Sequence, residues 1–220
     1  MLTFAAGIGN AFDLFRKPAD GSGAVDQLTN DKGPQHPMDW SDDARYLAFT
    51  RNNIGTGTDL KILAIDDEGR QSYDFLQTAV SEAHTQFAPG TPPRWVAYSA
   101  DETGRREIYV RAFTPGQPAS GAMWQVSSEG GTMPRWRGDG RELFYLGLDG
   151  GMMSVAVNGD GAAFRSAPPI TLFELHRPTL RTNSIEFDVT RDGQRFLIIE
   201  PSELAPFQTL SLVTNWLPRK

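Results

Sequence analysis

Residues 134–145 read PRWRGDGRELFY, and this short stretch carries most of the information about the architecture. A segment ending in Trp136 is followed by the polar turn Asp139-Gly140 and by the apolar run Leu143-Phe144-Tyr145. Asp-Gly between two such runs is a strong hairpin signal, because a type I′ turn needs positive φ at both central residues, which Asp tolerates and Gly adopts freely. The stretch therefore predicts two antiparallel strands joined by a tight turn.

The same layout returns three more times along the chain. Residues 38–49 read MDWSDDARYLAF, residues 187–198 read FDVTRDGQRFLI, and residues 85–98 give a longer version with Pro89-Gly90 in the turn. The leading aromatic residues are Trp40, Phe87, Trp136 and Phe187, in steps of about 47, 49 and 51 residues. A third strand that starts with an acidic residue follows, as at 59–63 and 107–110, and then a less regular fourth. Four short strands per repeat predict a β-propeller blade.

A single four-stranded sheet of this size cannot bury either of its faces, so neighbouring sheets have to cover them. The bulky aromatic residues are expected between stacked blades rather than against a ligand: Trp40, Trp95, Tyr98, Trp124, Trp136 and Tyr145. We therefore predict a single all-β domain over residues 1–220, an incomplete β-propeller of about four and a half four-stranded blades. The blades are expected at 1–32 (partial), 33–78, 79–130, 131–178 and 179–220 (partial).

An open arc leaves the flat faces of its end blades in water, as apolar patches that monomers seldom tolerate. Three arrangements would cover them, and the sequence leaves all three open. The chain is a fragment whose missing N-terminal blades complete the ring, or it closes a small ring by itself, or it self-associates.

The repeat resembles a known family. The segments 136–145, 106–113 (REIYVRAF) and 123–132 are similar to the TolB-like repeat, also called the WD40-like or PD40 propeller repeat. They are closest in pattern to the propellers C-terminal to bacterial eukaryotic-type serine/threonine kinases, which implies a sensory or scaffolding role in a larger signalling protein. Kinase motifs are absent here, so no kinase activity is implied. Asp43-Ala44 and the segment 89–93 replace the family's Asp-Gly, so both turns are expected to differ in backbone geometry.

Composition narrows the partners. The formal net charge is −6, the sequence pI is about 5.1, and no run of Lys and Arg could neutralise a row of phosphates, so nucleic acid is not an expected partner. No window approaches the roughly 18 apolar residues of a membrane span, so no membrane insertion is expected within this chain. Cysteine is absent, which leaves the compartment open. The resemblance implies a periplasmic or extracytoplasmic location if the chain is part of a TolB-like or kinase-linked protein, and a cytoplasmic one otherwise.

The sequence contains no recognisable catalytic machinery. Ser22 lies in Gly21-Ser22-Gly23, which is not a nucleophile elbow, and no pair of histidines has a metal-ligand spacing. Asp66-Asp67-Glu68-Gly69 lacks the alternating ligands of a calcium loop. We therefore predict no catalytic residue, no metal site and no cofactor.

The remaining candidates are polar residues on the innermost strands, where side chains reach the central channel of a propeller. Four stand immediately before the marker aromatic residues, and two histidines stand near the strand starts: Asp39, Gln86, Arg135 and Glu186, with His36 and His84. They favour a non-catalytic module that binds a protein or a small molecule in a rigid frame. Two alternatives stay open: a propeller hydrolase with carboxylates and a histidine at the channel mouth, and a TolB-like component of an envelope complex.

Overall fold

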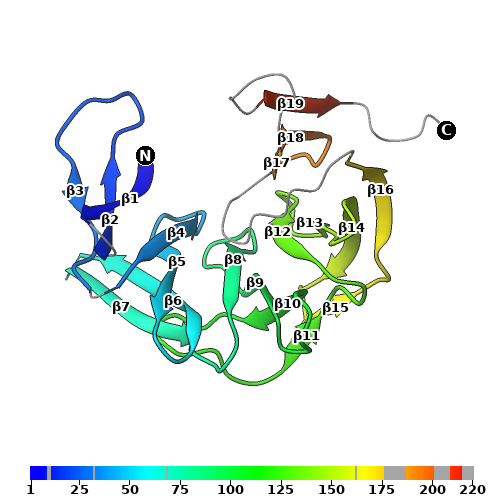
Figure 1. The fold of residues 1–220 in the computed structure, drawn as a ribbon, viewed down its shortest axis with the longest axis horizontal. Coiled ribbons are helices and arrows are strands. Elements are labelled where there is room, and N and C mark those ends of the chain that lie inside the picture. The colour runs from blue at the N-terminus through cyan, green and yellow to red at the C-terminus, as the bar shows by residue number, and fades with distance from the viewer. Residues whose placement is uncertain are drawn as a thin grey trace.

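The computed structural model describes residues 1–8, 11–31, 33–67, 69–161, 163–175, 187–200 and 209–214. These residues form 19 strands and no helix, and the strands make five separate antiparallel sheets. The sheets follow one another around an open arc, with β1–β3 at one end and β17–β19 at the other (Figure 1). The prediction of an all-β propeller fold is confirmed, and the described sheets form an open arc (Figure 1).

Each sheet uses consecutive strands, and the first three sheets are simple meanders. The first sheet contains β1 (Leu2–Ile8), β2 (Ala11–Lys17) and β3 (Asp26–Gln27). The second contains β4 (Gln35–Trp40), β5 (Tyr46–Asn53), β6 (Gly57–Asp66) and β7 (Gly69–Leu76). The third contains β8 (Glu82–Phe87), β9 (Trp95–Ala100), β10 (Glu107–Ala112) and β11 (Met123–Gln125).

The fourth sheet has an extra strand, and the last has three strands. The fourth contains β12 (Thr132–Trp136), β13 (Glu142–Leu146), β14 (Gly151–Asn158), β15 (Arg165–Ser166) and β16 (Ile170–Glu174), with both β15 and β16 paired to β14. The last contains β17 (Phe187–Val189), β18 (Arg195–Glu200) and β19 (Thr209–Thr214). The first strands β4, β8, β12 and β17 lie on the inside of the arc (Figure 1).

The turn after the inner strand corrects one expectation. Ala44 adopts φ 55°, close to the 69° of Gly140 and the 73° of Gly193 at the same place in their turns. In all three turns the preceding Asp carboxylate accepts a hydrogen bond from the backbone N–H two residues on, at 3.0–3.2 Å. The expectation that the Ala44 turn differs in geometry is therefore wrong, because the Asp-centred hydrogen bonds hold even a non-glycine residue in the left-handed region.

The turn of the third sheet does differ, as expected from its sequence. Trp136 pairs with Leu143 in the fourth sheet, whereas Phe87 pairs with Val96, so this turn is two residues longer. Gly90 within it has φ 131°, and its N–H donates to the carboxylate of Asp42 in the preceding sheet at 3.0 Å. The longer loop therefore reaches the neighbouring blade.

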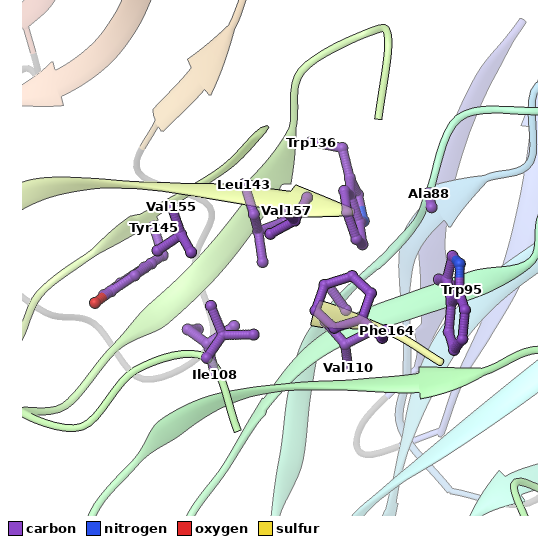
Figure 2. Packing of buried hydrophobic residues seen from close by; sticks show 12 residues of the cluster. Ala88, Trp95, Ile108, Val110, Trp136, Leu143, Tyr145, Val155, Val157 and Phe164 are labelled. Atoms are coloured by element: carbon purple, nitrogen blue, oxygen red, sulfur yellow. The ribbon is translucent and has the colours of Figure 1, made fainter. Parts of the chain in front are cut away.

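Aromatic residues fill the spaces between sheets, as the repeat predicts. Between the third and fourth sheets, Phe164 packs against Trp95, Trp124 and Trp136, with ring centroids 5.5, 6.2 and 6.1 Å apart. Figure 2 shows Phe164, Trp95 and Trp136 meeting at one side of this cluster and Tyr145, Val155 and Ile108 at the other. Burial of this apolar surface stabilises the contact between the two blades, because the side chains of one sheet cover the face of the neighbouring sheet.

In the part of the chain that the structure describes, there is no helix with the length and apolar character that a membrane crossing needs.

Candidate functional site

The inner strands place one polar side chain per sheet at the same height. Asp39 pairs with Ala48, Gln86 with Ala97 and Arg135 with Phe144. Each of these is the second-to-last residue pair before the turn that joins its two strands. These three candidates therefore form a row around the inside of the arc.

The fourth member of the row is Asp188. Asp188 pairs with Leu197, and Val189 pairs with Phe196 ahead of the Asp192-Gly193 turn, so Val189 takes the place of Trp40 and Trp136. The predicted candidate, Glu186, lies outside the described residues. Alignment of Phe187 with Trp40 and Trp136 shifts the predicted row residue by two positions. Alignment on the Asp192-Gly193 turn instead indicates Asp188.

Asp39 and Gln86 join neighbouring sheets. The carboxylate of Asp39 accepts a hydrogen bond from the backbone N–H of Phe87 in the next sheet at 2.9 Å. The side-chain oxygen of Gln86 accepts one from the backbone N–H of Trp136 in the sheet after that, at 2.7 Å. Each side chain satisfies a backbone donor that lacks a strand partner on the inside of the arc, so both have a structural role.

Arg135 interrupts this pattern because a guanidinium has no acceptor. The N–H of Val189, which would be its partner in the next sheet, instead bonds the carboxylate of Asp188 at 2.9 Å. Arg135 Nε lies 3.6 Å from the same carboxylate oxygen, Asp188 Oδ1, and its guanidinium lies 5.8 Å from the centre of the Phe187 ring. The last two sheets are thus joined by charge where the earlier ones are joined by hydrogen bonds.

Burial shapes the protonation of this row. Burial raises the pKa of Asp39 to about 7, while the hydrogen bond from Phe87 and the charge of Arg135 act in the opposite direction. Burial lowers the pKa of Arg135, and the carboxylates of Asp188 and Asp39 oppose that effect. Asp39 is therefore poised to exchange a proton near neutral pH.

The two candidate histidines have different environments. His84 is 2% exposed, and its Nδ1 lies 3.0 Å from the hydroxyls of both Ser99 and Thr132. Burial, together with the charges of Arg106 and Arg135, lowers the pKa of His84 to about 3, so the ring is neutral.

His84 also has an unusual backbone. Its φ is 53°, at a bulge where the pairing register of β8 shifts, and Met133 has φ 56° at the matching bulge of β12. His36 lies half-buried in β4 opposite Thr50. No hydrogen bond joins His84 to a carboxylate within the described ranges, so the acid–histidine pair of the hydrolase alternative is not assembled at this residue.

A pocket of about 200 Å³ opens where the four inner strands end. Its walls come from four successive sheets: Asp39, Trp40, Asp42, Gln86, Phe87, Ala88, Pro89, Trp136, Gly138, Val189 and Arg191. We call this the mouth pocket. Of the predicted candidates, Asp39 and Gln86 line it, whereas His36, His84 and Arg135 are not among its described walls.

The mouth pocket combines aromatic walls with groups that bind polar ligands. Asp39 and Asp42 supply carboxylates and Arg191 supplies a guanidinium. The indoles of Trp40 and Trp136 are held by hydrogen bonds to Thr3 Oγ1 (2.9 Å) and to the backbone oxygen of Gln86 (3.3 Å). The described residues contain no group of three or more His, Cys, Asp or Glu side chains placed to hold a metal ion.

No family model matches the sequence, and no curated protein matches it. Solved structures do match. TolB from Acinetobacter baumannii aligns with 96% of this chain with a TM-score of 0.65 at 13% identity. The fold is that of a TolB-like β-propeller.

Other propellers of this kind are similar to the chain at comparable levels. A putative 6-phosphogluconolactonase from Bacteroides uniformis has a TM-score of 0.55 and 12% identity, covering 96% of this chain and 70% of that one. The periplasmic gluconolactonase PpgL from Pseudomonas aeruginosa has a TM-score of 0.53 and 13% identity, covering 92% of this chain and 64% of that one. This chain spans 50% of the length of the Acinetobacter protein. At these identities the likeness concerns the fold alone.

Proposed function

We propose that this TolB-like propeller is a non-catalytic recognition module that binds a polar group of a protein partner or a small molecule in the mouth pocket. The observation that carries the proposal is that the pocket walls come from four sheets. These sheets are joined by the hydrogen bonds to Asp39 and Gln86 and by the Arg135–Asp188 ion pair. Such a frame keeps aromatic and charged groups in fixed positions without needing the ligand to order them.

The size and lining of the pocket indicate the ligand chemistry. A volume of about 200 Å³ suits one side chain or a small polar molecule rather than a drug-sized ligand. The half-buried ring of Trp40 suits stacking, and Asp42 and Arg191 suit hydrogen bonds to a polar rim. Membership of a larger bacterial signalling protein or of an envelope complex is compatible with such a module.

One observation favours a hydrolase as the second candidate. Asp39 lines the mouth pocket with a pKa raised to about 7, which is the property of a general acid–base group. Two of the similar structures carry lactonase names. In this candidate Asp39 would activate a water against a lactone, a role that competes with its hydrogen bond to Phe87.

Nuclear magnetic resonance of the tryptophan indole N–H groups tests both candidates. L-arginine, D-gluconate and D-glucose are titrated as probes, because they represent a cationic side chain, a small anion and a neutral sugar. We expect at least one probe to shift the signals of Trp40 and Trp136, which line the mouth pocket. The signals of Trp95 and Trp124, which are not among its walls, should stay in place as internal controls. The recognition proposal fails if no probe does so.

The hydrolase candidate is tested on the same protein with D-glucono-1,5-lactone. We expect no turnover above the uncatalysed rate. Turnover that Asp39→Asn abolishes while the fold is retained would establish catalysis and refute the non-catalytic proposal. The exposed Asp192→Asn is the matched control, since it also removes one carboxylate.

A further inference from the structure

The acidic residue at the start of the third strand contacts the link to the next blade. In the three-stranded first sheet the matching residue is Asp13, on the middle strand β2, and both of its carboxylate oxygens have donors. They accept hydrogen bonds from the backbone N–H of Asp31 at 3.1 Å and from the side-chain amides of Gln35 and Gln27 at 3.3 Å each. Gln35, the first residue of β4, thus ties the second sheet to this carboxylate.

In the third sheet the equivalent residue is Glu107 of β10, and its carboxylate is satisfied in the same way. It accepts from the backbone N–H of Gly130 at 3.0 Å and from the hydroxyl of Ser127, and it pairs with Arg105 at 2.8 Å. A buried acid at this position is therefore compensated by donors on both oxygens, as such burial requires.

The second sheet lacks that compensation. Asp59 of β6 is fully buried, and its Oδ2 accepts from the side-chain amides of Asn53 and Gln77 at 3.1 Å each. Its Oδ1 is buried without a hydrogen-bond partner among the described residues. Arg51, directly across the strand pair from Asp59, approaches Asp74 instead, at 3.8 Å.

The residue that could donate to Asp59 is itself an acid. Glu82 is the first residue of β8, as Gln35 is the first residue of β4. Each pairs with a residue near the end of the following strand, Glu82 with Ala100 and Gln35 with Arg51. Glu82 is fully buried, and its Oε1 accepts from the hydroxyl of Thr78 at 2.5 Å. Its Oε2 is buried and has no described partner. The amide of Gln35 donates to Asp13 between the first and second sheets, whereas the matching residue between the second and third sheets, Glu82, is a carboxylate and therefore a second acceptor.

Electrostatics agrees with the proximity of the two acids. Burial raises the pKa of Glu82 to about 7, and the charge of Asp59 contributes to the increase. A third oxygen, Thr56 Oγ1, is buried without a partner in the described turn that precedes β6. The first residues of β6, directly after this turn, contact the residue that precedes β8, because the N–H of Thr58 donates to Ser81 Oγ at 3.4 Å.

We propose that the Asp59 and Glu82 carboxylates, with the Thr56 hydroxyl, bind a calcium ion between the second and third sheets. All three unpaired groups are oxygen ligands of the kind that hard cations prefer, and calcium tolerates irregular geometry and additional backbone or water ligands. The ion compensates Asp59 Oδ1 and Glu82 Oε2, two buried carboxylate oxygens that have no donor among the described residues. None of the three residues lines the mouth pocket, so this site is independent of the proposed function.

Thermal unfolding with calcium as the only probe tests the site. The full chain is stripped with a chelator and melted at pH 7.5 with or without calcium chloride. We expect calcium at about 100 times its dissociation constant to raise the midpoint by roughly 5 °C or more. Calorimetric titration should give one site per chain.

Glu82→Gln is the decisive variant, because it places at β8 the amide that Gln35 provides at β4. The amide can donate to Asp59, so the variant should fold and lose the calcium response. The control Glu129→Gln changes an acid that is 92% exposed and should respond like the unmodified protein. If Glu82→Gln does not fold, Asp59→Asn is examined in the same way.

Three outcomes would overturn the proposal. An unmodified protein that ignores calcium but gains stability on acidification from pH 7.5 to 5.5 would show that the two acids share a proton. A protein that responds to neither treatment would show that the unpaired oxygens need no ligand. Equal calcium responses in the unmodified protein and in Glu82→Gln would place the ion elsewhere.

Discussion

Replacing Gln86 with Ala separates a structural role of the inner row from a ligand-binding role. The side-chain oxygen of Gln86 accepts the backbone N–H of Trp136 at 2.7 Å, and Trp136 is 6% exposed. Removing the acceptor leaves a buried donor unsatisfied, which costs about 2 kcal/mol of unfolding free energy. For a domain of this size that corresponds to a fall in melting temperature of roughly 4–8 °C.

Differential scanning calorimetry in the absence of any ligand measures this change. Gln86→Glu keeps an acceptor oxygen at the same position and should lose much less stability than Gln86→Ala. Gln71→Ala, at an exposed position of β7, is the control for removing a glutamine side chain from a strand, and should change the midpoint little. Equal midpoints for Gln86→Ala and the unmodified protein would refute the idea that this row joins the blades.

Three further predictions concern stability. The unfolded chain protonates His84 near pH 6.5, whereas the folded protein protonates it only near pH 3. Acidification between these values should therefore lower the unfolding free energy, relative to that of His84→Gln, by about 1.4 kcal/mol per pH unit. Urea denaturation from pH 7 to 4 measures this change, and an equal pH dependence of the unfolding free energies of the two proteins would contradict the prediction. Ala44→Gly should stabilise the protein by roughly 0.5–1 kcal/mol in urea denaturation, because Ala44 holds φ 55° against its own preference, and a loss would show that the turn favours Ala. Phe164→Ala should lower the unfolding free energy by about 3–5 kcal/mol, because Phe164 fills the space between three tryptophan rings, whereas Phe164→Leu should lower it far less. Similar melting midpoints for the two variants in calorimetry would show that the aromatic ring contributes little packing energy there.

The blade repeat was readable from the amino-acid order because its signals are local. The Asp139-Gly140 turn, the strand ending in Trp136 and the acidic start of the third strand at Asp59 all lie within a few residues of the structure they specify. The positions of Asp39, Gln86 and Arg135 on the inner strands followed from the same pattern. The register failed only at the last blade, where Phe187 resembled a marker and Asp188 occupied the row.

What these residues do was decided by the curvature of the arc. The bonds from Phe87 to Asp39 and from Trp136 to Gln86 join residues 48 and 50 positions apart, and no local pattern shows that a backbone donor will arrive there. The influence of the Asp59 charge on the pKa of Glu82, and the four-sheet mouth pocket, have the same origin. Local preference specifies a strand or a turn, but the distance between side chains of different blades exists only after the sheets have packed face to face.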